Sequence, residues 1–401
     1  MPYRRIAVLV FAIFTAGCLW GVNEQVLYNF SGGDGSHSHT ALTYHAGALY
    51  GATASGGRFN AGEIFKLQQT TSGLVETVLY SFTGGADGDG PFCDLIFDSA
   101  GNIYGDTSFG GTNGGGVVYR LTPSGTGYTQ SVLYSFSGGS DGGLPFQNGK
   151  LLRDATGNLY GTASTGGVNN AGLVFKLTPS PNQWTETVLY NFTGGVDGGS
   201  PNAALVAQGT SLYGVTFAGG ASGNGTVFQL TPSKGVWTET VLYNFAGGSD
   251  GANPEGGVIF DQAGDIYGTT YAGGSPGYGT VYKLTHSVSG WTENVIYAFG
   301  SGSDGANPVA FLIIDKTGNL YGTTSGSFSG LPAGYGTVFR LSAAKSGWRE
   351  TVLHSFTGGV DGGNPFDSLL LLGGNLYGTA RDGGSSGFGG PGNGLIFRIV
   401  P

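Results

Sequence analysis

The chain has 401 residues with a net charge of −9, and only 10% of its residues are charged. Its 81 glycines and 15 prolines are typical of low-complexity sequence, but 25 Phe, 21 Tyr and 5 Trp are too many aromatic residues for a disordered polymer. The 16 Lys and Arg residues are scattered and cannot form a phosphate-binding surface, which excludes nucleic acid as a partner.

Residues 1–17 have the pattern of an export signal. The basic stretch MPYRR precedes an apolar run at residues 6–16, which is too short to span a bilayer as a helix. The run ends in TAGC, which resembles a bacterial lipobox with Cys18 as the lipid-attached residue, although Thr15 stands where an aliphatic residue is usual. Ordinary signal-peptidase cleavage nearby is the alternative.

This N-terminal pattern predicts an extracytoplasmic protein, either secreted or attached to the cell surface or outer membrane. The protein would then touch a membrane only through a lipid on Cys18, with residues 18–23 as a short tether. Because Cys18 and Cys93 are the two cysteines of the chain, no disulfide framework is expected. Cys93 has no His or basic cluster beside it in the sequence, so we predict a small core residue rather than a nucleophile.

The rest of the chain, residues 24–401, is a tandem repeat. A tag of the form V-[LI]-[YH]-x-F recurs at intervals of 52 to 57 residues, and it begins at Val26, Val78, Val132, Val188, Val241, Val295 and Val352. Self-similarity at a fixed period indicates a repeat architecture with one structural unit per copy. We predict one domain of seven such units.

Each unit contains four runs with the character of β-strands. After the tag and a glycine-rich acidic loop comes an apolar run such as residues 311–315, and a turn leads into GNLYGTT (318–324). A second glycine-rich loop precedes GTVFRL (336–341), and a polar connection leads to the fourth run, such as WTETVLYNF (184–192). β-Branched and aromatic residues in alternation predict strands, and no helical periodicity follows the signal. Four antiparallel strands repeated seven times indicate an all-β fold, a seven-bladed β-propeller.

The two ends of the domain predict how the ring closes. The last unit finishes after its third strand, residues 394–400, whereas the first begins with an orphan fourth strand, residues 26–30. Pairing these two would complete the last blade and remove both exposed edges. A Tyr in the second strand and an aromatic residue in the third recur in every unit, so we expect them to pack between blades rather than to stack on a ligand.

The motifs VLYSFTGG.DG..P, GNLYGTT and GTVFRL together resemble the GloVer tandem repeat of choice-of-anchor bacterial proteins. The resemblance covers essentially all of residues 24–401 and implies an exported, surface-associated protein with no defined activity. Members often end in a C-terminal sorting signal, and this chain ends in IFRIVP instead, which favours an N-terminal anchor. The D..GN.Y hairpin also resembles NHL-type propellers, which is a likeness of fold only.

The acidic loop carries one aspartate in each unit, always followed by glycine. Asp-Gly reverses the chain, because the carboxylate can accept nearby backbone N–H groups while glycine takes positive φ. We predict that these aspartates are turn residues first, with calcium binding as a weaker alternative, since a calcium site needs several converging carboxylates. They are Asp34, Asp87, Asp141, Asp197, Asp250, Asp304 and Asp361.

Catalytic motifs are few. His37, His39 and His45 cluster in the first unit, where a His-x-His pair could ligate a transition metal, but a solvated, degenerate loop near the ring closure is the favoured interpretation. No G-x-S-x-G elbow is present, and the glycine-rich loops open no helix that could cradle phosphate. We therefore predict no catalytic residues, no resident metal and no cofactor beyond the calcium alternative.

The leading functional hypothesis is a monomeric, non-catalytic binding or scaffold module. The loops after the second and fourth strands of each blade should emerge on one face, and this face would bind a glycan or protein ligand through loop aromatics. The alternative is an extracytoplasmic glycan lyase, hydrolase or lactonase with its site at the channel mouth. The candidate aromatics are Phe59, Phe109, Phe217, Tyr271, Tyr278, Phe328, Tyr335 and Phe388.

Overall fold

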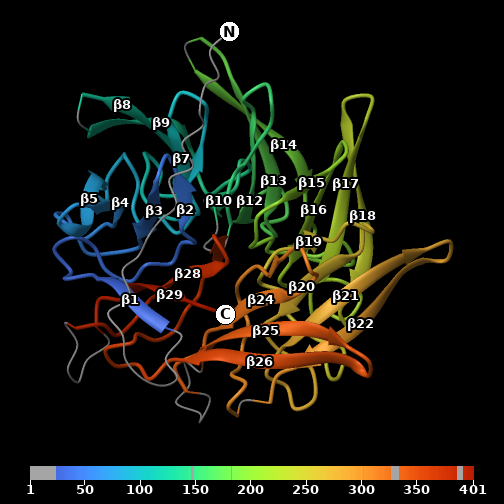
Figure 1. Ribbon diagram of the computed structural model, residues 1–401. Coiled ribbons are helices and arrows are strands. Elements are labelled where there is room, and N and C mark those ends of the chain that lie inside the picture. Colours follow the sequence, from blue (N-terminus) through green and yellow to red (C-terminus); the bar gives the residue numbers. More distant parts are fainter. Residues whose placement is uncertain are drawn as a thin grey trace, which may run out of the picture.

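The computed structural model of the protein describes residues 24–125, 127–145, 149–181, 183–300, 302–326, 334–385 and 392–401. In these residues 29 strands form seven antiparallel sheets, and no α-helix is present. The sheets are the blades of a β-propeller arranged around a central axis (Figure 1). The all-β, seven-bladed fold expected from the repeat is therefore confirmed. None of the described segments is a helix long and apolar enough to cross a membrane.

Six blades follow one another along the chain, and we number them 1 to 6. Blades 1 and 2 contain β2 (Thr43–His45), β3 (Ala48–Thr53), β4 (Glu63–Thr70) and β5 (Gly73–Ser81), then β6 (Ile96–Phe97), β7 (Ile103–Thr107), β8 (Val117–Ser124) and β9 (Gly127–Ser135). Blades 3 and 4 contain β10 (Gly143–Pro145), β11 (Leu152–Arg153), β12 (Leu159–Thr165), β13 (Leu173–Pro179) and β14 (Trp184–Asn191), then β15 (Val206–Gln208), β16 (Ser211–Thr216), β17 (Thr226–Ser233) and β18 (Val236–Asn244).

Blades 5 and 6 have the same composition. They contain β19 (Ile259–Phe260), β20 (Ile266–Thr270), β21 (Thr280–Ser287) and β22 (Gly290–Ala298), then β23 (Ile313–Ile314), β24 (Leu320–Thr324), β25 (Thr337–Ala344) and β26 (Gly347–Ser355). The seventh, closing blade contains β27 (Leu370–Leu372), β28 (Asn375–Ala380), β29 (Leu395–Ile399) and, from the other end of the domain, β1 (Glu24–Asn29).

The predicted ring closure is present. β1 pairs antiparallel with β29, with Glu24 opposite Ile399 and Asn29 opposite Leu395. In Figure 1 the blue β1 lies beside the red β29, so that the two ends of the domain share one sheet. The pairing covers the edge that each strand would otherwise expose, and the ring depends on a contact between residues more than 360 positions apart.

Burial follows strand position within a blade. The second and third strands are almost wholly buried, as in β20 and in the first three residues of β21, because neighbouring blades cover both of their faces. The fourth strand alternates between half-buried and exposed residues, as in β18, because its outer edge meets solvent. This gradient explains why Val, Leu, Ile and Phe fill the third strand, whereas Thr and Glu alternate in the fourth.

Aromatic pairs hold each blade to the next, and we call each such contact between neighbouring blades a seam. The Phe that ends the tag of one blade packs against the third-strand aromatic of the following blade, with ring centroids 5.1 to 5.2 Å apart in most seams and 5.0 Å in one. Edge-to-face geometry of this kind adds stabilisation beyond area burial. The pairs are Phe30–Phe65, Phe82–Tyr119, Phe136–Phe175, Phe192–Phe228, Phe245–Tyr282, Phe299–Phe339 and Phe356–Phe397.

The rings of these pairs are buried, and the third-strand aromatics pack between blades as the sequence pattern predicted. Two details differ from the expected strands. The innermost strands have only two or three residues where runs of five or six were expected. In blade 3 the innermost position is divided between β10 and β11, which both pair with β12.

Candidate functional site

The loops after the second and fourth strands lie on one face, as predicted, and we call it the acidic-loop face. Short backbone bridges connect the acidic loop that enters a blade to the glycine-rich loop of the same blade. Asp89 pairs in this way with Phe109, Ala252 with Ala272, and Gly363 with Asp382. Side chains from two separate parts of each repeat therefore meet on this face.

The aspartates of the acidic loops close their turns. Asp197 accepts a hydrogen bond from the hydroxyl of Tyr190 at 3.0 Å, from the backbone N–H of Thr193 at 2.9 Å, and from the hydroxyl of Thr193. The tag tyrosine makes the same contact with Asp34, Asp87, Asp141, Asp250 and Asp304. In the last unit His354 replaces the tyrosine, and its Nε2 lies 3.4 Å from Asp361.

In these contacts the carboxylate oxygens already accept hydrogen bonds from the protein. Calcium would need the same oxygens as free ligands. Among the residues that the structure describes, no group of three or more His, Cys, Asp or Glu side chains is arranged to hold a metal ion. The geometry therefore supports the turn role of the aspartates.

At the seams between blades 4, 5 and 6 an asparagine fastens the acidic loop to the preceding blade. Asn253 and Asn307 both have φ of 57°, which places their amides over the glycine-rich loop of the blade before. Asn253 Nδ2 donates to the carbonyl of Phe217, and Asn307 Nδ2 donates to that of Tyr271, each at 3.0 Å. Asn tolerates this left-handed conformation better than most residues. The side-chain amides of Asn253 and Asn307 are therefore already hydrogen-bonded within the fold.

The seam between the closing blade and blade 1, the closing seam, has a different arrangement. His37 occupies the asparagine position with φ of 52°, and its Nε2 lies 3.9 Å from Asp382. Arg381 Nε lies 3.9 Å from the same carboxylate, and Asn364 Nδ2 donates to it at 2.6 Å. Burial lowers the pKa of His37, and the neighbouring Asp382 partly opposes this effect. We call these four residues the polar cluster.

A row of aromatic rings extends from the polar cluster. The guanidinium of Arg381 lies 5.6 Å from the ring centroid of Phe366, and His39 stacks on Phe366 at 5.0 Å. Phe92 contacts His39 edge-on at 5.2 Å. A Cβ on Gly90 would lie 2.7 Å from the Phe92 ring and 3.5 Å from that of Phe109, so these two rings flank the same glycine. We call Phe366, His39, Phe92 and Phe109 the aromatic row.

The solvated position expected for the histidines is wrong for His39. His39 is buried, and burial followed by the charge of Arg381 lowers its pKa to about 3, which keeps the ring neutral. The reason is tertiary: residues 366 and 381 are distant in sequence, but ring closure brings them beside blade 1 and covers the loop. His45 stacks on Phe97 at 4.0 Å, away from the other two histidines, so the three do not form one site.

The predicted loop aromatics are distributed around the face. Phe59, Phe109 and Tyr335 are 48%, 45% and 50% exposed, and Phe217, Tyr271 and Tyr278 are half-buried. Only Phe109 belongs to the aromatic row. Phe328, Phe388 and Cys18 lie outside the described residues.

Sequence reasoning missed Phe92, Phe366, Arg381 and Asp382. One signal was available: Arg-Asp at 381–382 stands where blades 4 and 5 have Phe-Ala and Tyr-Ala.

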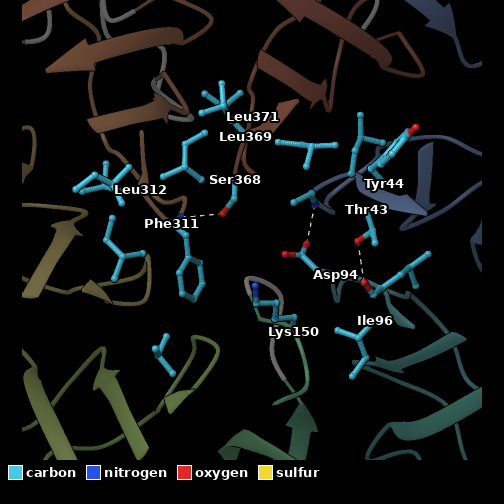
Figure 2. A pocket seen from close by; sticks show the side chains of 18 of the residues that line it. Thr43, Tyr44, Asp94, Ile96, Lys150, Phe311, Leu312, Ser368, Leu369 and Leu371 are labelled. Atoms are coloured by element: carbon cyan, nitrogen blue, oxygen red, sulfur yellow. Dashed lines mark hydrogen bonds between the residues drawn. The ribbon is translucent and has the colours of Figure 1, made fainter. Parts of the chain in front are cut away.

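A cavity of about 730 Å³ occupies the centre of the ring. Its described lining comes from the innermost strands of several blades and is mostly Leu, Ile, Val and Phe, with Asp94 and Lys150 as the charged side chains. Figure 2 shows these two side chains pointing toward the same space, across from Phe311. Asp94 accepts the backbone N–H of Ala41 at 2.7 Å, and burial raises its pKa.

Other ionisable groups lie buried near Asp94. Burial raises the pKa of Asp106 to about 8, and the pKa of Asp367 is also raised, first by burial and then by the charge of Asp94. Cys93 is a free, fully buried cysteine whose thiol pKa is raised by burial, which confirms the predicted core role and disfavours the reactive thiolate. These groups are shielded from solvent, whereas the polar cluster and Phe109 are partly exposed.

Comparisons with solved structures show the propeller fold at low identity. The extracellular domain of a candidate one-component system from B. thetaiotaomicron has a TM-score of 0.56 at 10% identity, covering 94% of this chain and 39% of that one. A candidate 6-phosphogluconolactonase from Bacteroides fragilis has a TM-score of 0.51 at 14% identity, with 84% and 89% covered. A polysaccharide lyase, an ulvan lyase bound to a glucuronate–sulfated rhamnose unit, has a TM-score of 0.50 at 10% identity, with 94% and 95% covered.

The comparison with curated proteins finds no match. The sequence model of the Gloeobacter/Verrucomicrobia repeat matches residues 10–221 and 147–397, which together span nearly the whole chain and confirm the resemblance drawn from the repeated motifs. The chain belongs to the Gloeobacter/Verrucomicrobia repeat family.

Proposed function

We propose that the protein is an extracytoplasmic, non-catalytic glycan-binding module, and that it binds an oligosaccharide across the closing seam of the acidic-loop face. The observation that carries the proposal is the continuity of the aromatic row with the polar cluster, from Phe109 to Arg381 and Asp382. Aromatic faces and planar polar groups in series are what a sugar chain needs, since each sugar has an apolar ring face and a rim of hydroxyls.

The parts of the site have separate roles in this proposal. Phe109 is 45% exposed and supplies a platform for the apolar face of one sugar. Phe92, His39 and Phe366 support the platform and fix its position relative to the polar cluster. Arg381 can donate hydrogen bonds to the next sugar, and Asp382, which is oriented by the Nδ2 of Asn364, can accept them, so hydroxyl or carboxylate groups of that sugar can be bound in a defined orientation.

Support for an extracytoplasmic place comes from the export pattern of residues 1–17 and from the character of proteins with a similar fold. These include an extracellular domain and a polysaccharide lyase described with a uronate-containing glycan. Their identity to this chain is low, and they make a glycan ligand a reasonable choice for the first experiment.

A glycan-acting enzyme is the second candidate, because His37, Arg381 and Asp382 place a titratable ring beside a cation and a carboxylate. A binding module is favoured because Asp106 and Asp367 are buried, and because His39 is held neutral between two rings. The same protein sample can test both candidates, since turnover of a bound oligosaccharide would be visible as product.

The test is an oligosaccharide array with neutral and uronate-containing ligands, followed by calorimetry of the strongest ligand. Phe109→Ala and Arg381→Gln should each weaken binding by tenfold or more, which corresponds to about 1.4 kcal/mol. Phe59→Ala is the matched control, because Phe59 has nearly the same exposure and lies outside the aromatic row. Equal losses for Phe59→Ala and Phe109→Ala, or no glycan bound by the folded protein, would contradict the proposal.

A further inference from the structure

The outer strand of each blade places one polar side chain at the same point of the seam. Each of these residues lies opposite a buried Leu or Ile of the third strand, as Gln130 lies opposite Leu121 and Glu239 opposite Leu230. The position holds glutamate in six blades and glutamine in one. Its occupants are Glu24, Glu76, Gln130, Glu186, Glu239, Glu293 and Glu350.

Gln130 shows what this position requires. Its Nε2 donates a hydrogen bond to the backbone carbonyl of Asp87, in the acidic loop that enters the same blade, at 3.1 Å. A glutamate side chain has almost the same shape, but it can donate such a bond only when it is protonated. The position therefore favours a neutral donor over a carboxylate.

The six glutamates lack this bond in their ionised form. In each of them Oε1 is buried and has no hydrogen-bond partner. Leaving a buried polar atom unpaired costs free energy, and an ionised carboxylate costs more than a neutral one. Protonation would remove the charge and would supply the proton that Gln130 supplies with its amide.

The charges that face these glutamates act in the same direction. Glu239 faces Asp197 of the acidic loop and the hydroxyl of Tyr190, and Glu76 faces Asp34, Tyr28 and Glu63. Asp361, Asp141, Asp250 and Asp304 face the remaining four. Burial first, and these negative charges second, raise the pKa of each glutamate from 4.5 to about 7.

We propose that the glutamates of six seams take up protons when the propeller folds, so that the blades are held together most firmly in mildly acidic surroundings. A folded-state pKa above the unfolded value means that the stabilisation is fully present below about pH 4.5 and is lost as pH rises through 7. Because the same position recurs in six blades, the pH dependence of stability should be larger than one residue could produce.

Other groups also titrate in this range, so the test compares variants rather than pH values. His37, His39 and His354 have lowered pKa values and act in the opposite direction, whereas Glu255 and Asp106, with raised pKa values, act in the same direction as the six glutamates. These groups are identical in wild type and in variants of the seam position. Their contributions therefore cancel when the two are compared at each pH.

The experiment measures urea midpoints of the full chain at pH 5 and pH 8.5. A variant with all six glutamates changed to Gln should have a slightly higher midpoint than wild type at pH 5 and a much higher one at pH 8.5. Glu239→Gln should show a smaller gain of the same sign and the same pH dependence. Gln130→Glu is the matched control: its midpoint should be slightly below that of wild type at pH 5 and further below it at pH 8.5. The differences should persist in 0.5 M NaCl, because they arise from local burial more than from long-range repulsion.

Either of two results would overturn the proposal: midpoint differences that are the same at both pH values, or a Gln130→Glu variant that is as stable as wild type at pH 8.5. If the six-fold variant does not fold, the two single substitutions decide the question.

Discussion

The closing seam and the regular seams of this propeller are alike in their core and different on their face. In the core, Phe30 and Phe65 of the closing seam lie 5.2 Å apart at 62°, and Phe192 and Phe228 of a regular seam lie 5.1 Å apart at 65°. On the face, Asn253 and Asn307 at two regular seams bond to backbone carbonyls, whereas the closing seam gathers His37, Arg381 and Asp382. The ring can therefore close with standard packing while one seam carries different chemistry.

The difference follows from how each contact is satisfied. Asn307 uses its amide on the carbonyl of Tyr271, so that its polar group is consumed by the fold. His37 keeps the same left-handed backbone, but its Nδ1 lies near the hydroxyls of Ser36 and Ser55, at 3.2 and 3.0 Å. Its other nitrogen is directed toward Asp382. The ring of His37 therefore contacts side chains of both blades, whereas the amide of Asn307 is bound to a backbone carbonyl.

The largest effect is expected from breaking the closure itself. Deletion of residues 24–29 removes β1 and leaves the backbone groups of β29 without their partners along a full edge. We expect the free energy of unfolding to fall by about 4 kcal/mol or more, with aggregation on heating. Thermal melts and light scattering measure both. Deletion of residues 1–23 is the control, and it should leave the melting midpoint almost unchanged; equal midpoints for the two deletions would contradict closure by β1.

An intermediate loss of stability is expected when one core ring is removed at each kind of seam. Phe65→Ala at the closing seam and Phe228→Ala at a regular seam each remove a fully buried ring, so each should cost about 3–5 kcal/mol. Because the two ring pairs have nearly the same geometry, the costs should agree within about 1 kcal/mol. Denaturant unfolding gives both values. A much smaller cost at Phe65 would mean that the closing seam is packed less tightly than the others.

The sequence predicted the part of the molecule that repeats. The tag Phe, the third-strand aromatic and the orphan strand at residues 26–30 recur in register, so the blades, their number and their closure could all be derived from the sequence. The candidate site could not, because Phe366 and His39 come into contact only when the ends of the domain meet. Loop aromatics were sought by type, and only Phe109 of the aromatic row was found in this way.

The seam glutamates show a second limit of sequence reasoning. Glu239 looks like a solvated residue on an exposed strand, since it alternates with threonines in WTETV. Its burial arises from the neighbouring acidic loop, which no periodicity within the strand can indicate. Gln130 is the one visible departure in this column, and its meaning depends on the carbonyl of Asp87 that it contacts.

The smallest effect is expected from exchanging the residues that distinguish the closing seam from a regular seam on the acidic-loop face. Asn307→His should cost about 1 kcal/mol, because the carbonyl of Tyr271 loses its amide donor. His37→Asn should stabilise the protein by a similar or smaller amount, since asparagine suits φ of 52° and restores a donor at this position.

The gain in stability from His37→Asn should be larger at pH 5.5 than at pH 8. Burial lowers the pKa of His37 in the folded state, so its stabilisation is present above pH 6.5 and is lost as pH falls. Urea midpoints of both variants at the two pH values measure this, and a destabilised His37→Asn variant with no pH dependence would mean that His37 is held by contacts that asparagine cannot replace.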